Sequence, residues 1–271
     1  MNNTDRDIVV STRVRLARSL DGMLFPLKMS EEDALQLDKR IQERINGNED
    51  FKVYLMRDLG NTERQVLVER HLASAALVNK PTSMLMLNDD ETISILVGEE
   101  DHVRIQCILE GLSLDKADEL TRSVYAIIAG EGYAFDDKLG YLTACPTNVG
   151  TGIRASVMLH LPALTMTGQM GNLQKTLQNN GIAVRGIYGE GSNSMGSIFQ
   201  ISNRVTLGAS EQQLADGVDR TVNEIVRLEN DTCTLLKDSA PISVEDGVFR
   251  AYGILAHTRS IDLNEFMRLW S

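Results

Sequence analysis

Residues 84–109 read MLMLNDDETISILVGEEDHVRIQCIL, and this stretch decides the fold class. It contains three short apolar segments, at residues 84–87, 92–97 and 103–109, separated by connections of a few residues. In the third segment apolar and polar side chains alternate, which is typical of a strand. Short connections join antiparallel strands, whereas parallel strands need a long crossover. The stretch therefore predicts an antiparallel meander.

The rest of the chain surrounds this meander with helices and further strands. Apolar residues at helical spacing predict helices, and short apolar runs predict strands. Because the two are mixed without a strict strand–helix–strand rhythm, we expect an α+β fold, mainly an antiparallel sheet flanked by α-helices. The expected helices span residues 30–45, 61–71, 113–129, 162–179, 210–228, 244–255 and 262–270, and the further strands span residues 51–55, 155–161, 182–187 and 197–202.

Length and composition exclude several classes of protein. The chain has 271 residues, enough for a sizeable core, and a net charge of -11, which argues against a nucleic-acid-binding surface. No apolar run approaches the ~20 residues of a membrane span. The N-terminus lacks a signal-peptide pattern. Three widely spaced cysteines suggest neither a metal site nor disulfides, so we expect a reducing, cytoplasmic location.

The basic residues are mostly arginine: 19 are Arg and only 8 are Lys. Arginine offers a rigid, bidentate fork for carboxylate and phosphate groups. Composition alone favours the ordinary explanation, which is that these arginines form surface ion pairs.

Two short segments place arginine beside other polar groups. In Ser11–Arg15 (STRVR), Arg13 and Arg15 would share one face of a strand and could clamp phosphates. In Gly98–Arg104 (GEEDHVR), a carboxylate could position or deprotonate a nucleophile while Arg104 faces an anion. Taken alone, a solvated strand face and a solvated loop are the favoured interpretations of these segments.

The segment TACPTNVGTGIRAS, residues 143–156, is too particular for a routine connection. Cys145 precedes a proline and a polar loop, where neighbouring hydroxyl groups and a cation can activate a thiol. Gly150 and Gly152 would allow close approach of the backbone to a ligand. Arg154 begins the next strand.

Two further features have ordinary alternatives. Residues 185–194, RGIYGEGSNS, contain closely spaced glycines and suggest either a loop that folds over a ligand or a plain hairpin loop. His71, on an expected helix, is by itself more typical of a structural residue than of a ligand. No Walker, protein-kinase or HExxH motif is present, so any phosphate chemistry must rely on arginines.

Taken together and in this order, the segments resemble the catalytic domain of the phosphagen (ATP:guanido) kinases. That family shares the STRVR arginine pair, the EEDH-x-R segment and a Cys-Pro-(Thr/Ser)-Asn-x-Gly-Thr loop followed by Arg. Within it, the chain is most similar to the bacterial branch that acts on arginine residues in proteins. The resemblance implies the glutamine synthetase-like fold, ATP and Mg²⁺ as cofactors, and protein substrates with exposed arginine. It also admits a regulatory activator protein or a homodimeric partner, and it implies no nucleic acid or membrane.

The resemblance also implies a role for each site residue. Glu100 would orient the guanidinium and act as base, Cys145 would be a reactive thiolate, and Glu190 would be a candidate second carboxylate. In the small-guanidine kinases that second carboxylate stands where this chain has Asn193. The implied nucleotide site comprises Ser11, Thr12, Arg13, Val14, Arg15, His71, Arg104, Arg154, Ala155, Ser156, Val157, Met158, Arg185, Gly186, Ile187, Tyr188, Gly189 and Glu190, and no protein metal ligand is expected.

The expected domain organisation is one catalytic domain over residues 1–258. Residues 259–271 would begin a truncated or missing C-terminal helical region, as the related proteins continue for several more helices. The main expectation is phosphorylation of protein arginine. The alternatives are a nucleotide-binding regulatory or adaptor domain without catalysis, and a kinase for a small free guanidino compound.

Overall fold

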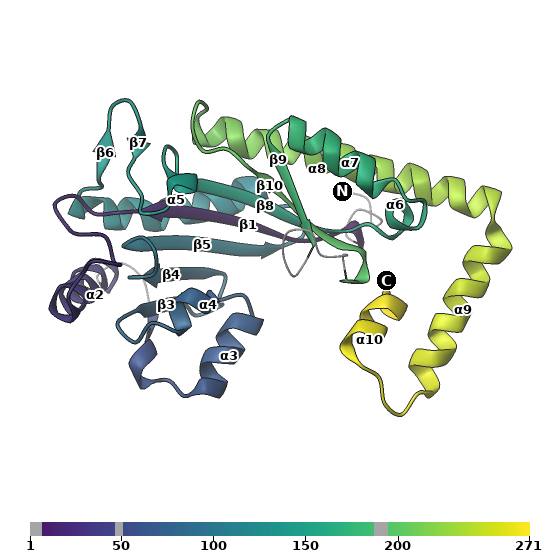
Figure 1. Ribbon diagram of the computed structural model, residues 1–271, viewed down its shortest axis with the longest axis horizontal. Coiled ribbons are helices and arrows are strands. Elements are labelled where there is room, and N and C mark those ends of the chain that lie inside the picture. Colours follow the sequence, from purple (N-terminus) through teal and green to yellow (C-terminus); the bar gives the residue numbers. More distant parts are fainter. Residues whose placement is uncertain (1–6, 47–50, 187–194) are drawn as a thin grey trace.

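The central element of the molecule is an eight-stranded antiparallel sheet (Figure 1). The computed structural model describes residues 7–46, 51–186 and 195–271. The strand order is β2-β3-β4-β5-β1-β8-β10-β9, so the meander predicted from residues 84–109 is confirmed as three adjacent strands, β3, β4 and β5. The strands are β1 (Val9–Arg18), β2 (Phe51–Leu55), β3 (Met84–Asn88), β4 (Ile93–Val97), β5 (Val103–Glu110), β8 (Ile153–His160), β9 (Ile182–Gly186) and β10 (Ile198–Asn203).

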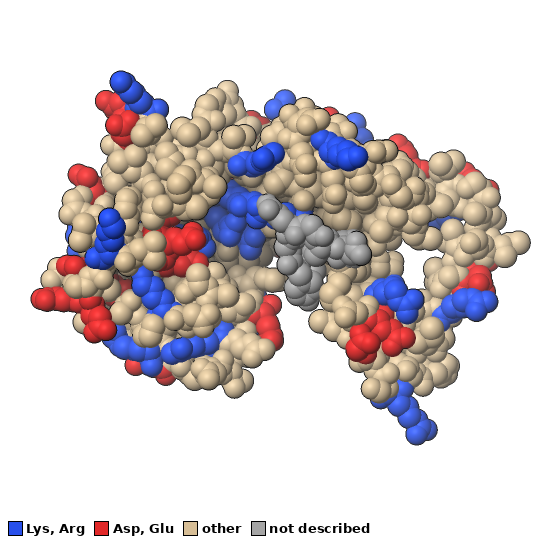
Figure 2. Space-filling view, in the orientation of Figure 1, with Lys and Arg blue, Asp and Glu red and all other residues tan. Residues whose placement is uncertain are grey.

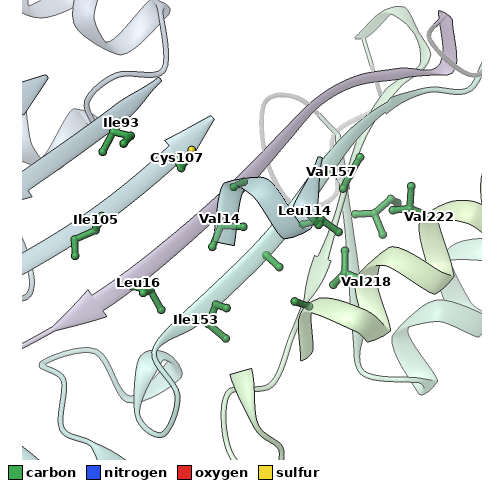
Figure 3. Packing of buried hydrophobic residues seen from close by; sticks show 14 of the residues in the cluster. Val14, Leu16, Ile93, Ile105, Cys107, Leu114, Ile153, Val157, Val218 and Val222 are labelled. Atoms are coloured by element: carbon green, nitrogen blue, oxygen red, sulfur yellow. The ribbon is translucent and has the colours of Figure 1, made fainter. Parts of the chain in front are cut away.

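One face of the sheet is buried under long helices and holds the main core (Figure 3). Val14 and Leu16 of β1 point into this core, as alternation along a strand requires. Helix α5 (Leu114–Ile128) and helix α8 (Glu211–Ser239) supply Leu114, Val218 and Val222 from the other side. The expected α+β class, an antiparallel sheet flanked by helices, is therefore confirmed.

The opposite face is covered at one end and open in the middle. Helices α3 (Asn61–Glu69) and α4 (Ala75–Val78) pack on β3 and β4 through a second, smaller core that includes Leu67, Leu77 and Leu85. Helix α2 (Glu31–Ile45) adds to the main core instead, and its predicted start is confirmed because Asp33 N donates to Ser30 Oγ at 3.1 Å. The uncovered middle of this face carries the polar residues described below.

Several helix boundaries differ from those expected. The helix expected over residues 162–179 is two helices, α6 (Pro162–Met166) and α7 (Met170–Asn179). Gly168 separates them, and its φ of 71° cannot continue a helix. Helix α8 runs on to Ser239 because its later turns still bury Glu229 and Thr232. A short hairpin of β6 (Phe135–Asp136) and β7 (Gly140–Tyr141) lies beyond the main sheet.

The last two helices lie outside the sheet and its covering helices, and only the first of them extends away from the sheet (Figure 1). Helix α9 (Pro241–His257) buries none of its residues, and α10 (Leu263–Trp270) turns back toward β8. The Trp270 ring lies 5.0 Å from the His160 ring, measured between centroids. Among the helices that the structure describes, none is long and apolar enough to cross a membrane.

Asp38, a buried carboxyl on α2, is expected to destabilise the fold at neutral and higher pH. Burial raises its pKa to about 7, although Arg57 and Lys80 act in the opposite direction. A carboxyl whose folded pKa is raised favours folding below its unfolded pKa, and this contribution is lost as pH rises through 7. Asp38→Asn should therefore raise the free energy of unfolding at about pH 8 by on the order of 2–4 kcal/mol.

The measurement is urea unfolding of Asp38→Asn and wild type at about pH 8 and about pH 4. The gain should nearly vanish at the lower pH, where the wild-type carboxyl is protonated. Asp58→Asn, which alters an exposed carboxylate, is the control and should change little at either pH. An equal gain at both pH values would contradict the assignment.

Candidate active site

Arginine side chains from neighbouring strands converge on the open face of the sheet. Arg15 of β1 lies directly opposite Arg154 of β8, and Ala17 lies opposite Arg104 of β5. Because directly opposed residues project from the same face, Arg13, Arg15, Arg104 and Arg154 form one group, which we call the arginine floor. Figure 2 shows basic side chains gathered in a hollow at the middle of this face.

Arg185 extends the arginine floor toward the edge of the sheet. It lies opposite Gln200 of β10, which in turn lies opposite Met158 of β8. Ser11, Ser156 and Met158, also predicted to bind nucleotide, share this face by the same register. A pocket of 840 Å³ reaches this end of the arginine floor: Arg154 and Arg185 are among its lining residues, together with core-facing residues such as Phe199 and residues of α7.

The arginine floor is electrostatically strained. Burial, together with the neighbouring charges of Arg154 and Arg104, lowers the pKa of Arg13 to about 10. Burial, together with Arg13, Arg104 and Arg154, also holds the pKa of Arg15 well below its usual range. The buried Nε of Arg13 has no hydrogen-bond partner among the described residues. Such mutual repulsion would be relieved by a polyanion bound on the floor.

Four residues predicted to bind nucleotide place their side chains on the opposite, core-facing side. Val14, Ala155 and Val157 are buried in the main core, and Thr12 Oγ1 donates to Gly111 O at 2.6 Å. Strand alternation explains this placement, because every second residue of β1 and β8 points away from the arginine floor. Their side chains are therefore structural.

The acidic segment after β4 borders the arginine floor, and its two glutamates differ sharply. The Glu99 side chain is 4% exposed, pairs with Arg104 Nη1 at 2.6 Å and accepts a hydrogen bond from Ser74. The Glu100 side chain is 50% exposed and lies 3.4 Å from Arg104 Nη2. Glu99 is thus fixed as a structural partner of Arg104, while Glu100 can receive a substrate from solvent.

Asp101 connects this acidic segment to the segment that carries Cys145. Its Oδ1 accepts from Ala144 N at 2.6 Å and from Ser19 Oγ at 3.2 Å, and the whole side chain is buried. Cys145 itself is half-buried, and its Sγ lies 3.0 Å from Thr147 Oγ1. The sequence pattern predicted no role for Asp101, which stands between Glu100 and His102.

Gly150 and Gly152 are required by contacts within the protein. Both have positive φ, 108° and 61°. A Cβ at Gly152 would lie 2.6 Å from Ala17 O, and one at Gly150 would collide with Thr206 O. The close approach predicted for these glycines is therefore an approach to the chain's own backbone. It packs the Cys145 segment against β1 and against the residues that follow β10.

His71 lies beside the arginine floor. It was expected on a helix, but it lies just beyond the end of one. Helix α3 ends at Glu69, and His71 follows with a φ of 59°. Gln106, which projects from the floor side of β5, donates from Nε2 to His71 O at 2.8 Å. Desolvation lowers the pKa of His71, and the charge of Arg13 lowers it further.

Arg18 is a structural arginine that the sequence analysis missed. It is buried, pairs with Glu211 of α8 at 2.7 Å and lies 3.7 Å from the centroid of the Tyr141 ring. It also donates to Thr151 O at 2.8 Å, which holds the segment after Cys145 in place. Its position in STRVRLAR, on the core-facing side with Leu16, is the signal that separates it from Arg13 and Arg15.

The predicted site residues Ile187, Tyr188, Gly189 and Glu190 lie outside the described residues, as do the neighbouring Asn193 and Ser194. Gly186 is described, as the last residue of β9.

Asp101→Ala is expected to displace the Cys145 segment. The substitution leaves the Ala144 N–H without its acceptor, which should cost on the order of 1–3 kcal/mol of stability. We expect kcat to fall with little change in the KM for ATP, because the arginine floor is untouched. Asp101→Asn keeps one acceptor oxygen and should restore part of kcat. Steady-state kinetics with varied ATP and thermal unfolding check this, and parallel losses in kcat and ATP affinity would contradict it.

Comparison with known proteins agrees with this geometry. The family profile described as "ATP:guanido phosphotransferase, C-terminal catalytic domain" matches residues 34–232. The fold also matches lombricine kinase, with TM-score 0.75 and 23% identity over 83% of this chain and 67% of that chain. It matches the duplicated taurocyamine kinase of Schistosoma mansoni with bound transition-state-analogue components, with TM-score 0.75 and 26% identity over 87% of this chain and 34% of that chain. The chain belongs to the ATP:guanido phosphotransferase family, as its motifs predicted.

Its curated relatives include bacterial protein-arginine kinases. The protein-arginine kinase of Caldanaerobacter subterraneus subsp. tengcongensis is 44% identical, covering 98% of this chain and 81% of the relative. That of Halalkalibacterium halodurans is also 44% identical, covering 96% of this chain and 75% of the relative. The similarity therefore extends over nearly the whole chain and includes every segment of the site described above.

Proposed function

We propose that this protein transfers the γ-phosphoryl group of ATP to the guanidinium of arginine residues in proteins. The observation that carries the proposal is the arginine floor, whose mutually repelling cations lie beside the exposed carboxylate of Glu100. A triphosphate would neutralise the floor, and a substrate cation would be attracted to Glu100. The protein-arginine kinases among its relatives support a protein acceptor.

In the proposed step, a terminal guanidinium nitrogen attacks the γ-phosphorus. A P–N bond forms, the bond from the γ-phosphorus to the bridging oxygen breaks, and ADP leaves with that electron pair. A guanidinium is protonated at neutral pH, so its attacking nitrogen must lose a proton, which Glu100 would accept. Positioning and charge stabilisation supply most of the catalysis in phosphoryl transfer. Arg13, Arg15, Arg104 and Arg154 would stabilise the charge on the transferred group.

Cys145 is proposed to act on the substrate cation. As a thiolate it would add a negative charge beside the substrate guanidinium. The hydrogen bond from Ala144 N to Asp101 holds the segment that carries Cys145 in place. Glu190 stays the candidate for a second carboxylate. We also propose a reducing, cytoplasmic location, which the free thiols of Cys107, Cys145 and Cys233 suit.

The residues of the site are compatible with Mg²⁺ that binds together with ATP and is held mainly by its phosphates. Among the described residues, no group of three or more His, Cys, Asp or Glu side chains could hold a metal ion. Mg²⁺ is ordinarily held by phosphates, water and one or two carboxylates, so a protein cage is not needed. When bound, it would supply positive charge to the triphosphate; Glu99 and Glu100, which both pair with Arg104 of the floor, are the carboxylates that could contact it.

The test is incubation with [γ-³²P]ATP and casein, beside free arginine as a second acceptor. We expect label on casein that is lost in acid, as a P–N bond requires, and little on free arginine. Acid-stable label would indicate a hydroxyl acceptor. Label confined to free arginine would favour the small-guanidine kinase, and no label on either would favour the non-catalytic alternative.

A further inference from the structure

Three apolar side chains lie exposed on the loop that leads from β1 to α2. Leu24 is 60% exposed, Phe25 is 37% exposed and Leu27 is 81% exposed. We call these three residues the apolar rim. Single exposed leucines are normal on protein surfaces, but three within four residues form a local patch.

The apolar rim is fastened to the acidic segment by buried donors. His102 Nε2 contacts Leu24 O at 2.8 Å, and the His102 ring stacks with the Phe25 ring at 6.3 Å between centroids. His102 Nδ1 accepts from Leu20 N at 2.8 Å, so the ring donates through Nε2. Burial lowers the pKa of this imidazole, which favours the neutral form that these two bonds require.

Lys80 supplies a second tie between the two segments. Its Nζ donates to Pro26 O at 3.1 Å and to Gly98 O at 2.7 Å. One ammonium group therefore holds the backbone of the rim loop to the backbone that leads directly into Glu99 and Glu100. The exposure of Leu24 and Leu27 is thus a feature of an anchored loop next to the site.

We propose that the apolar rim binds apolar side chains next to the target arginine in a protein substrate. This inference rests on the proposed function. The target cation would be attracted to the half-exposed Glu100, and Lys80 ties the rim loop to the backbone that leads into Glu100, which brings the rim within reach of residues beside that arginine in a substrate chain. A flanking leucine that meets the rim would remove apolar surface from water on both partners. A free guanidino compound has no flanking residues and would gain nothing.

The experiment compares two peptides of equal length and charge, each with one arginine, flanked by leucines in one and by glycines in the other. Wild type should favour the leucine peptide by about tenfold in kcat/KM, the effect of partly burying one or two leucines. The double variant Leu24→Ser/Leu27→Ser should lose this preference and keep the wild-type rate on the glycine peptide. Leu139→Ser, a 49% exposed leucine in the β6–β7 hairpin, is the control and should keep the preference.

Each other outcome overturns the inference. If the ratio of kcat/KM for the leucine peptide to kcat/KM for the glycine peptide is the same in wild type and in the double variant, the rim does not select substrates, although the proposed function stands. If wild type phosphorylates neither peptide nor casein, the proposed function fails and the inference with it. If light scattering shows that wild type is a dimer and the double variant a monomer, the rim joins two copies of this chain instead.

Discussion

Glu100→Gln is expected to bind ATP as tightly as wild type and to lose phosphotransfer by on the order of 10²–10⁴-fold. The amide keeps the size of the side chain but can neither accept the guanidinium proton nor attract the cation. ATP binding should survive because the arginine floor is unchanged. Glu100 is also exposed and only weakly paired with Arg104, so the substitution should leave the stability of the fold unchanged.

The measurements are ATP titration by calorimetry and initial rates of arginine phosphorylation. Glu265→Gln is a matched control, because Glu265 is an exposed glutamate that lies 3.9 Å from an arginine on its own helix. It should behave as wild type in both assays. A Glu100→Gln enzyme with the wild-type rate would remove Glu100 from the mechanism.

Arg15→Met is expected to make the nucleotide-free protein more stable and nearly inactive. Burial and three neighbouring arginines disfavour the charged form of Arg15, so an apolar side chain of similar length should raise the free energy of unfolding by on the order of 1–3 kcal/mol. The same change removes a cation that would stabilise the transferred phosphoryl group, which should lower kcat by about 10²–10³-fold.

Opposite changes in stability and activity distinguish this prediction from simple damage to the fold. Thermal unfolding without nucleotide measures the first effect, and phosphotransfer rates measure the second. Arg250→Met, in an exposed ion pair with Asp246 on α9, should change neither. A less stable Arg15→Met protein would show that the arginine floor is neutralised within the chain itself.

The fold was predictable from sequence because its signals are local. Short connections within residues 84–109 define adjacent antiparallel strands, and Ser30 with Asp33 defines the start of α2. Helix ends were less predictable. The break at Gly168 and the extension of α8 to Ser239 depend on tertiary packing as much as on spacing.

The site was only partly predictable, because sequence spacing does not say which strands are neighbours. The alternation of β1 places Arg13 and Arg15 on one face, but their approach to Arg154 and Arg104 depends on β1 lying between β8 and β5. For the same reason the sequence did not show that the side chains of Ala155 and Val157, within three residues of Arg154, face the core.

Asp101 and Arg18 show the same limit in another form. Asp101 holds Ala144 across 43 positions, and Arg18 reaches Thr151 and Glu211 across still longer separations. Both are acidic or basic residues, and the sequence alone does not reveal that their side chains are buried. They connect the Cys145 segment to the sheet and to α8, so the geometry proposed for catalysis depends on residues that carry no recognisable motif.

The most direct test of the central claim uses two acceptor proteins that differ only in having arginine or lysine at the exposed positions. Each is incubated with ATP and the wild-type enzyme, and phosphorylated residues are located by mass spectrometry at neutral pH, where a P–N bond survives. We predict phosphoarginine on the first acceptor and no modification of the second. Equal phosphorylation of both acceptors, or of neither while free arginine is phosphorylated, would contradict the account.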